Sequence, residues 1–238
     1  MASTSARSSL AQRRGVVGAA RRAGGRTGMA AGTRHRGAGG GPSLARRSRL
    51  VLVRASESGE AREAKVGVIF VCLGNICRSP TAEAVFATRV EMAGLEDAFD
   101  VDSCGTGGGS SNWYKPGGFS YHEGEQGDPR MRAAASERGI AITSVSRPLR
   151  EEDFERFQYI VGMDESNLGA ITLAATEWQV PPPEEGGYKV VSMADYCTKH
   201  DVAKVPDPYY AGGFDKVIDL LEDACEGLLG EIQKERGL

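Results

Sequence analysis

Short apolar runs alternate with amphipathic stretches from residue 65 to the end of the chain. The first run, residues 66–71, is rich in β-branched residues and interrupted only by Gly67, which is typical of a strand buried on both faces. A glycine inside such a strand indicates that another part of the chain approaches it closely. Apolar residues then recur at helical spacing over residues 82–93, with Pro80 suited to the first turn and Gly94 to the C-cap. The pattern therefore predicts a strand, a loop and a helix in succession.

The same alternation continues along the chain. Further strands are expected at residues 99–103, 158–163 and 188–193, and helices after the capping residues Asp128 and Asp164 and near residues 151 and 214. Residues 181–187, PPPEEGG, are expected to form an exposed linker. Alternating strands and helices indicate βαβ units with right-handed crossovers. We therefore expect an α/β fold with three αβα layers around a central, mostly four-stranded parallel sheet, and a ligand at the carboxyl ends of its strands.

Charged residues are distributed unevenly. Residues 1–56 contain twelve Arg, no Lys and no acidic residue. Because the whole chain has 29 basic and 32 acidic residues, the remainder carries 17 basic against 32 acidic ones. An Arg-rich, Ser-containing, acid-free N-terminus is typical of an organelle transit peptide, and the alternative is a basic arm that binds nucleic acid or anionic surfaces. We expect residues 1–56 to be a disordered transit peptide, residues 57–64 a linker, and residues 65–238 one folded domain.

The N-terminal residues also suggest a destination. The Met-Ala start and the site at residues 53–55, VRA, resemble plant and algal plastid peptides, so we expect the chloroplast stroma, with the mitochondrion as second choice. The apolar patch at residues 50–53 is too short to span a membrane. The acidity of the remaining chain argues against nucleic acid as a partner. We therefore expect a monomer that binds neither membrane nor nucleic acid.

The cysteines favour a reduced compartment. They are odd in number and show no zinc-ligand spacing, and a disulfide framework would require pairs. We expect no metal and no cofactor. The five positions are Cys72, Cys77, Cys104, Cys197 and Cys225.

The loop between the first strand and the first helix, residues 72–79 (CLGNICRS), carries the candidate chemistry. Such a loop directs backbone N–H groups at one spot and, with the helix dipole, forms a binding site for a dianion. Gly74 and Asn75 tolerate the left-handed backbone angles that the curl requires. Arg78 can bind two phosphoryl oxygens with its planar guanidinium. The positive field of Arg78 and the loop N–H groups favours the thiolate form of Cys72, which is a nucleophile placed for in-line attack. A buried structural cysteine is the alternative, but it gives Arg78 and Asn75 no role.

The decapeptide VCLGNICRSP after a buried strand resembles the signature of the low-molecular-weight protein tyrosine phosphatases, and the resemblance extends over residues 65–229. It implies a two-step, metal-free hydrolysis of phosphotyrosine through a cysteinyl-phosphate intermediate. Cys72 is then the nucleophile, while Arg78 and the loop N–H groups hold the phosphoryl oxygens. Asp207, in the segment VPDPYY, is the general acid and base. Ser79 is placed by the resemblance to donate a hydrogen bond to the Cys72 thiolate.

The resemblance also assigns supporting residues. Ser103 is expected to support Asn75, although it could simply cap its own turn. Asp164 is expected to reach Arg78 as well as to cap a helix. The family usually has His where this chain has Ser144, which leaves the rigidity of the loop open. The expected substrate-binding residues are Leu73, Gly74, Asn75, Ile76, Cys77, Ser79, Tyr121, Tyr209 and Tyr210.

Three features near the loop have two interpretations each. Residues 107–119, GGGSSNWYKPGGF, look like an insertion, and Trp113 and Tyr114 either cover the site or pack on a neighbouring surface. His122 is more simply a solvated loop residue than a base. Cys77 either forms a reversible disulfide with Cys72 under oxidation or merely fills the loop.

Other activities occur on the same loop. Phosphoarginine phosphatases of this family carry Thr where this chain has Ile76, and arsenate reductases need shuttle cysteines that this chain does not offer as a close pair. A catalytically silent phosphate-binding module is a third possibility, which the combination of Cys72, Arg78 and Asp207 disfavours. We therefore expect phosphotyrosine-containing proteins and small aryl phosphates as substrates, with phosphate or vanadate as competing ligands.

Overall fold

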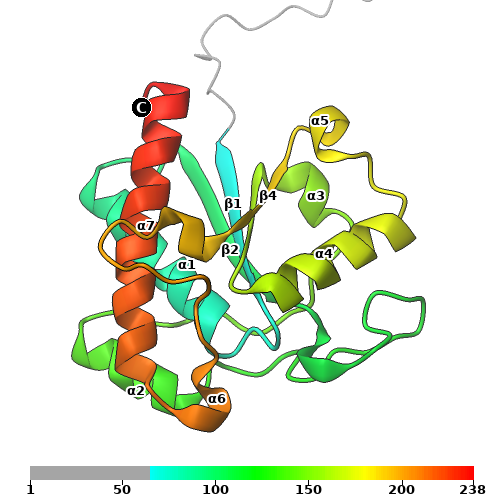
Figure 1. Cartoon of the computed structure of the whole chain (residues 1–238), viewed down its shortest axis with the longest axis horizontal. Helices are drawn as coiled ribbons and strands as arrows, with labels where there is room; N and C mark the ends of the chain where they lie inside the picture. The colour runs from blue at the N-terminus through cyan, green and yellow to red at the C-terminus, as the bar shows by residue number, and fades with distance from the viewer. Residues whose placement is uncertain (1–64) are drawn as a thin grey trace, which may run out of the picture. The chain divides into compact units, whose positions relative to one another are not determined.

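Four parallel strands form one sheet in the computed structural model, which describes residues 65–238. The predicted transit peptide and linker lie outside the described residues. The strand order is β2-β1-β3-β4, which confirms the expected four-stranded parallel sheet (Figure 1). The strands are β1 (Val66–Cys72), β2 (Phe99–Gly105), β3 (Tyr159–Gly162) and β4 (Lys189–Ser192).

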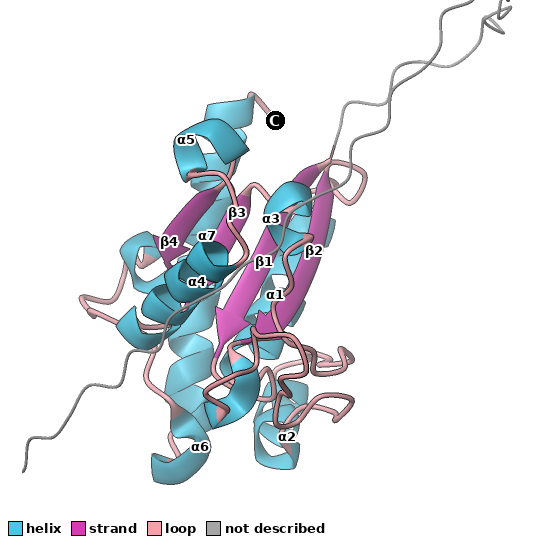
Figure 2. Ribbon diagram, turned by 90° about the vertical axis from the view of Figure 1, so that its right-hand side faces the viewer, coloured by secondary structure: helices cyan, strands magenta, loops and turns pink. Residues whose placement is uncertain are grey.

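Helices cover both faces of this sheet, as Figure 2 shows. Alternate residues of β1 belong to two different hydrophobic cores: Val68 and Phe70 pack in the core that contains residues of the first and last helices. Ile69 and Val71 pack in the second core on the opposite face. The helices of the first face are α1 (Arg78–Met92), α2 (Pro129–Glu137) and α7 (Phe214–Arg236), and those of the second are α3 (Asp153–Arg156) and α4 (Glu165–Glu177). The three αβα layers are thus confirmed.

The predicted capping and glycine signals are found in place. The side chain of Asp128 accepts a hydrogen bond from the N–H of Arg130 at the start of α2, and Asp164 accepts one from the N–H of Asn167 at the start of α4. A Cβ on Gly67 would lie 2.5 Å from the carbonyl oxygen of Arg156, so the close approach expected there is real. These local contacts fix where the helices begin relative to the strand ends.

Some boundaries agree with the prediction and others differ from it. Helix α1 begins at Arg78, which places Pro80 in its first turn as expected. The expected linker at residues 181–187 contains a short helix, α5 (Pro183–Gly186). Helix α7, expected near residue 214, extends to Arg236, and Ile232 in its last turns is still fully buried. In the part of the chain that the structure describes, no helix is both long and apolar enough to cross a membrane. The remaining short helices are η1 (Gly107–Gly109), η2 (Met193–Tyr196) and α6 (Pro208–Ala211).

Candidate active site

The loop after β1 is held from outside by its carbonyl groups. The N–H of Thr106 donates to the carbonyl of residue 72 at 2.9 Å, and that of Gly108 donates to the carbonyl of residue 73 at 2.8 Å. The hydroxyl of Ser146 donates to the carbonyl of residue 74 at 2.9 Å, and the N–H of Asp128 donates to that of residue 76 at 2.7 Å. Four hydrogen bonds from three different segments, residues 106–108, Asp128 and Ser146, therefore fix the shape of the loop.

These bonds also orient the loop's N–H groups. In a planar trans peptide the C=O of one residue and the N–H of the next point in opposite directions. Carbonyls bonded outward at residues 72, 73, 74 and 76 therefore direct the N–H groups of residues 73, 74, 75 and 77 inward. The N–H of Asn75 shows this directly, because it donates to the Cys72 sulfur at 3.3 Å. Asn75 has a φ of 53°, the left-handed angle that the sequence predicted.

Cys72 lies at the carboxyl end of β1, where the sheet topology places a ligand. Its side chain is buried, and its sulfur also accepts a hydrogen bond from the hydroxyl of Ser79 at 3.0 Å. This is the contact that the resemblance implied. Two donors from the first turn of α1 and the loop therefore converge on the sulfur and can stabilise negative charge on it.

Arg78 is 2% exposed and lies between two carboxylates. Its Nη1 donates to Asp164 at 2.5 Å and to the carbonyl of Val205 at 3.1 Å, and its Nη2 donates to Asp207 at 2.8 Å. Burial would lower the pKa of Arg78, but the charges of Cys72, Asp164 and Asp207 raise it, so the guanidinium stays charged. Asp164 therefore both pairs with Arg78 and caps helix α4.

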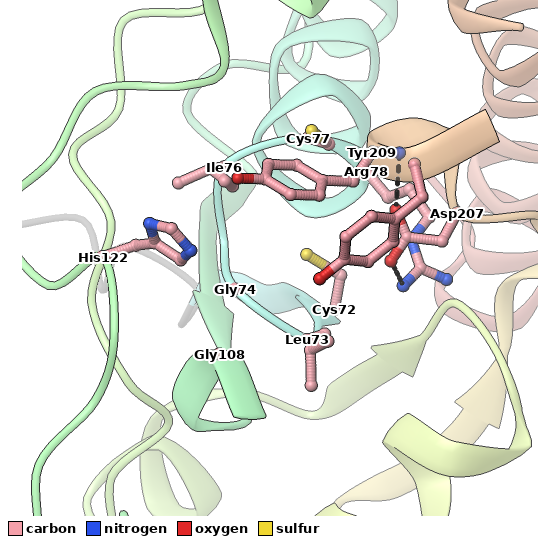
Figure 3. A pocket seen from close by; sticks show the side chains of 11 residues that line it. Cys72, Leu73, Gly74, Ile76, Cys77, Arg78, Gly108, His122, Asp207 and Tyr209 are labelled. Atoms are coloured by element: carbon pink, nitrogen blue, oxygen red, sulfur yellow. Dashed lines mark hydrogen bonds and ion pairs between the residues drawn. The ribbon is translucent and has the colours of Figure 1, made fainter. Parts of the chain in front are cut away.

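A pocket opens over this group, and Figure 3 shows the Cys72 sulfur and the Arg78–Asp207 pair inside it. The other Asp207 oxygen accepts a hydrogen bond from the N–H of Tyr209 at 3.1 Å. The carboxylate therefore lies within the same small volume as the sulfur and the guanidinium. The lining residues are Cys72, Leu73, Gly74, Ile76, Cys77, Arg78, Gly108, His122, Asp207, Tyr209 and Tyr210.

One predicted wall residue is displaced. Tyr121 is about half exposed, packs edge-on against Phe119 with ring centres 4.9 Å apart, and lies outside the pocket lining. His122 lines the pocket instead (Figure 3). It lies in the turn of residues 121–124 with a φ of 68°, and its Nδ1 is 2.8 Å from a carboxylate oxygen of Glu125. The sequence favoured a solvated loop residue at this position, and no local signal marks the reversal.

The comparison with known families agrees with this geometry. The model of the family "Low molecular weight phosphotyrosine protein phosphatase" matches residues 67–238. The chain belongs to this family. The phosphatase is 39% identical over 178 residues to the low molecular weight protein-tyrosine-phosphatase YfkJ of Bacillus subtilis, an alignment that covers 73% of the chain and 99% of that relative. It is therefore a protein tyrosine phosphatase by family, and a hydrolase.

Solved structures share its fold. A protein tyrosine phosphatase from Entamoeba histolytica, crystallised with Hepes in the active site, is 42% identical, with a TM-score of 0.60 over 73% of the phosphatase and 99% of that chain. An arginine phosphatase of Drosophila is 28% identical, with a TM-score of 0.59 over 70% of the phosphatase and 97% of that chain. The same fold thus also occurs in a protein named an arginine phosphatase.

Behind the loop, a chain of polar side chains leads away from the sulfur of the phosphatase. The amide of Asn75 donates to Ser79 at 3.0 Å and to Ser103 at 2.8 Å, and Ser103 donates to Glu83 at 2.5 Å. Ser103 thus contacts Asn75 as expected. Asn75 and Ser79 are buried behind the pocket lining, so they support the loop rather than line it.

Glu83 could not be identified from the sequence, because a single polar residue beside the buried face of α1 gives no sign of its contacts. Burial raises the pKa of Glu83, and its hydrogen bonds with Ser103 and Ser144 lower it less. Ser144, the residue that replaces the usual His, thus contacts the carboxylate at the end of the polar chain. The phosphatase retains a hydrogen-bonding partner at that position, but a neutral one.

The structure bears on two questions that the sequence left open, the packing of Trp113 and Tyr114 and the role of Cys77. Trp113 packs against Trp178 with ring centres 5.9 Å apart, and the indole N–H of Trp178 donates to the carbonyl of Tyr114 at 2.8 Å. The aromatic residues of the insertion therefore pack on the end of α4.

Cys77 is buried in the loop. Burial, together with the charges of Asp128 and Cys72, raises the pKa of its thiol, so Cys77 is a poor thiolate nucleophile.

Proposed function

We propose that Cys72, Arg78 and Asp207 hydrolyse phosphotyrosine in two steps. In the first, the Cys72 sulfur attacks phosphorus, the bond from phosphorus to the phenolic oxygen breaks, and Asp207 gives its proton to that oxygen. In the second, Asp207 takes a proton from water as the water oxygen attacks phosphorus, and the sulfur–phosphorus bond breaks to regenerate the thiolate. Arg78 and the inward N–H groups of residues 73, 74, 75 and 77 hold the remaining phosphoryl oxygens in both steps.

The observation that best supports this proposal is the inward orientation of the loop N–H groups. Because four carbonyls are bonded outward, four N–H groups and one buried guanidinium form a rigid set of donors around the sulfur. A phosphoryl group offers three acceptor oxygens to these donors while the sulfur attacks its phosphorus. Leu73, Ile76, Tyr209 and Tyr210 supply apolar surface at the mouth, which suits a phenolic ring.

A kinetic comparison tests these roles. We expect the wild type to hydrolyse para-nitrophenyl phosphate and a phosphotyrosyl peptide without added metal, and vanadate to compete. Cys72→Ser should abolish turnover, and Asp207→Ala should lower kcat/KM by about 100-fold or more for the peptide. Turnover that survives Cys72→Ser would overturn the nucleophile assignment, and a folded wild type that binds vanadate without turnover would identify a phosphate-binding module.

Phosphoarginine is the second candidate substrate, because one structural relative is an arginine phosphatase. The side chain of Ile76 lines the pocket and is 8% exposed. A β-branched apolar residue there offers no hydrogen bond to a guanidinium leaving group, which favours a phenolic ring. We expect phosphotyrosine to be preferred in a direct competition of the two phosphopeptides, and Ile76→Thr to shift the ratio of kcat/KM values toward phosphoarginine.

We also propose that residues 1–56 direct the enzyme to the chloroplast stroma and that residues 65–238 act there as a monomer. Residues 1–56 contain twelve arginines and no acidic residue, which supports a targeting role for this segment rather than a nucleic-acid-binding one. Import of the full chain into isolated chloroplasts and mitochondria, followed by N-terminal sequencing of the processed product, tests it. Recovery in neither organelle would refute the targeting role, and Asp207→Ala used as a trap in stromal extract would identify the protein substrates.

A further inference from the structure

The side chain of Arg130 joins three segments beside the active site. Its Nε and Nη2 donate to the two carboxylate oxygens of Asp128 at 3.0 and 2.7 Å, so the pair is bidentate. Nη2 also donates to the backbone carbonyl of Tyr209 at 3.1 Å. The guanidinium carbon lies 5.3 Å from the ring centre of Tyr209 and 5.0 Å from that of Phe214. One side chain of α2 thus contacts residues on both sides of the turn between α6 and α7.

Asp128 connects this arrangement to the phosphate-binding loop. Its N–H donates to the carbonyl of Ile76 at 2.7 Å, and its side chain is 7% exposed. A continuous series of contacts therefore runs from Ile76 through Asp128 and Arg130 to Tyr209. It links the loop that holds the nucleophile to the segment that holds the acid, which are far apart in the sequence.

The segment that carries Asp207 packs against the first core through Tyr209 but makes few hydrogen bonds to the rest of the protein. Within the described residues, residues 206–212 are joined to the rest of the protein by two hydrogen bonds, from Arg78 to Asp207 and from Arg130 to Tyr209. The segment ends in Gly212, whose φ of 74° is an angle that glycine adopts freely. A phosphoryl group bound by Arg78 competes with Asp207 for the Nη2 donor of Arg78. The contact from Arg130 is the one that such a substrate leaves in place.

We propose that Arg130, held by Asp128, is a positioning residue that keeps Asp207 over the leaving oxygen while Arg78 is engaged by the phosphoryl group. It acts through Tyr209, whose carbonyl it binds and whose N–H donates to Asp207 at 3.1 Å. The Asp-Pro-Arg sequence at the start of α2 is therefore more than a helix cap. This proposal rests on the proposed acid role of Asp207.

The test measures how the rate depends on the leaving group. An aryl phosphate with a poor leaving group, such as phenyl phosphate, needs the acid, whereas para-nitrophenyl phosphate releases a far more stable anion and needs it less. Arg130→Lys keeps the charge but loses the planar fork and the stacking. We expect it to lower kcat/KM by about tenfold for phenyl phosphate and by about twofold or less for para-nitrophenyl phosphate. Arg132→Lys, the same change two residues along the exposed side of α2, is the matched control and should alter neither value.

The outcomes separate the two proposals. Equal losses on both substrates, or no loss on either, would show that Arg130 has a structural role only, and would overturn the inference. Asp207→Ala, measured alongside, should also lose more kcat/KM for phenyl phosphate than for para-nitrophenyl phosphate, and its losses should be larger than those of Arg130→Lys. If Asp207→Ala shows no selectivity, the acid assignment itself fails and the inference falls with it. If Asp207→Ala is selective and Arg130→Lys is not, the acid assignment stands alone.

Discussion

Gly105, at the end of β2, touches the phosphate-binding loop so closely that one added methyl group should disturb catalysis. A Cβ at Gly105 would lie 3.0 Å from the carbonyl oxygen of Leu73, 3.1 Å from the N of Asn75 and 3.1 Å from the carbonyl carbon of Gly74. All three are backbone atoms, so no flexible side chain can move out of the way. The loop must therefore shift by a few tenths of an ångström. The N–H that would move is the one that donates to the Cys72 sulfur.

The size of the effect follows from this displacement. A misplacement of about 1 Å can cost roughly 100-fold in rate, so a shift of about 0.35 Å should cost about fivefold, or roughly 1 kcal/mol of transition-state stabilisation. Overpacking should also lower the free energy of unfolding by about 1–3 kcal/mol. We expect Gly105→Ala to remain folded and to lose about fivefold in kcat/KM for para-nitrophenyl phosphate, with thermal unfolding measured on the same sample.

Gly94→Ala separates loop geometry from general destabilisation. Gly94 has a φ of 68°, and a Cβ at this position would meet nothing within 4 Å. Alanine there should therefore strain the backbone by about 1 kcal/mol without touching the site. It should lower the melting temperature and leave kcat/KM unchanged. The steric reasoning is wrong if Gly105→Ala retains full activity, or if Gly94→Ala loses as much activity as Gly105→Ala.

Three further predictions concern single side chains. Because its hydroxyl donates to the Cys72 sulfur at 3.0 Å, Ser79→Ala should slow release of phosphate from the cysteinyl intermediate by about tenfold, seen as a burst of phenol in stopped-flow assays. Burial raises the pKa of Glu83, so its ionisation opposes folding: urea titrations should show the wild type losing stability relative to Glu83→Gln as the pH rises above about 4.5, and a constant difference would contradict this. Burial alone would raise the pKa of Asp223, but hydrogen bonds from His200 and from the N–H groups of residues 198 and 199 lower it well below its usual range. Asp223→Asn should therefore cost about 2–4 kcal/mol near neutral pH, and the difference should shrink as the pH falls below about 4; a loss that does not depend on pH would argue against an ionised carboxylate.

The fold could be predicted because its signals are local. The β-branched run of β1, the capping carboxylates of Asp128 and Asp164, and the amphipathic pattern of α7 each depend on neighbours within a few residues. The left-handed angle at Asn75 was predictable for the same reason, since few residue types adopt it. Boundaries were less accurate because hydrophobic periodicity marks the interior of an element better than its ends; α7, for example, ends at the left-handed Gly237.

Some residues of the site could be predicted from the sequence and others could not, and the difference has a physical cause. Cys72 could be placed from the sequence because it ends a parallel strand, and Arg78 because it follows in the same loop. The pairing of Asp164 with Arg78 was implied by the family resemblance, and the position of Asp164 directly after β3 agrees with it. His122 and Arg130 could not be placed in the same way. One lies in a turn and the other at a helix start, and their places in the site depend on tertiary packing: His122 lines the pocket and Arg130 binds the carbonyl of Tyr209, neither of which has a local pattern.

The register of β2 explains why Glu83 was also hidden. Ser103 pairs with Phe70, so its side chain emerges on the face of the sheet that α1 covers, where it meets Glu83. A shift by one residue would turn Ser103 to the opposite face and bring Asp102 under α1 instead. The strand sequence FDVDSCG alternates apolar and acidic residues, so Ser103 shares the face of Phe99 and Val101. That Glu83 of α1 covers this face follows from the packing of the helix on the sheet, which the sequence of β2 by itself does not specify.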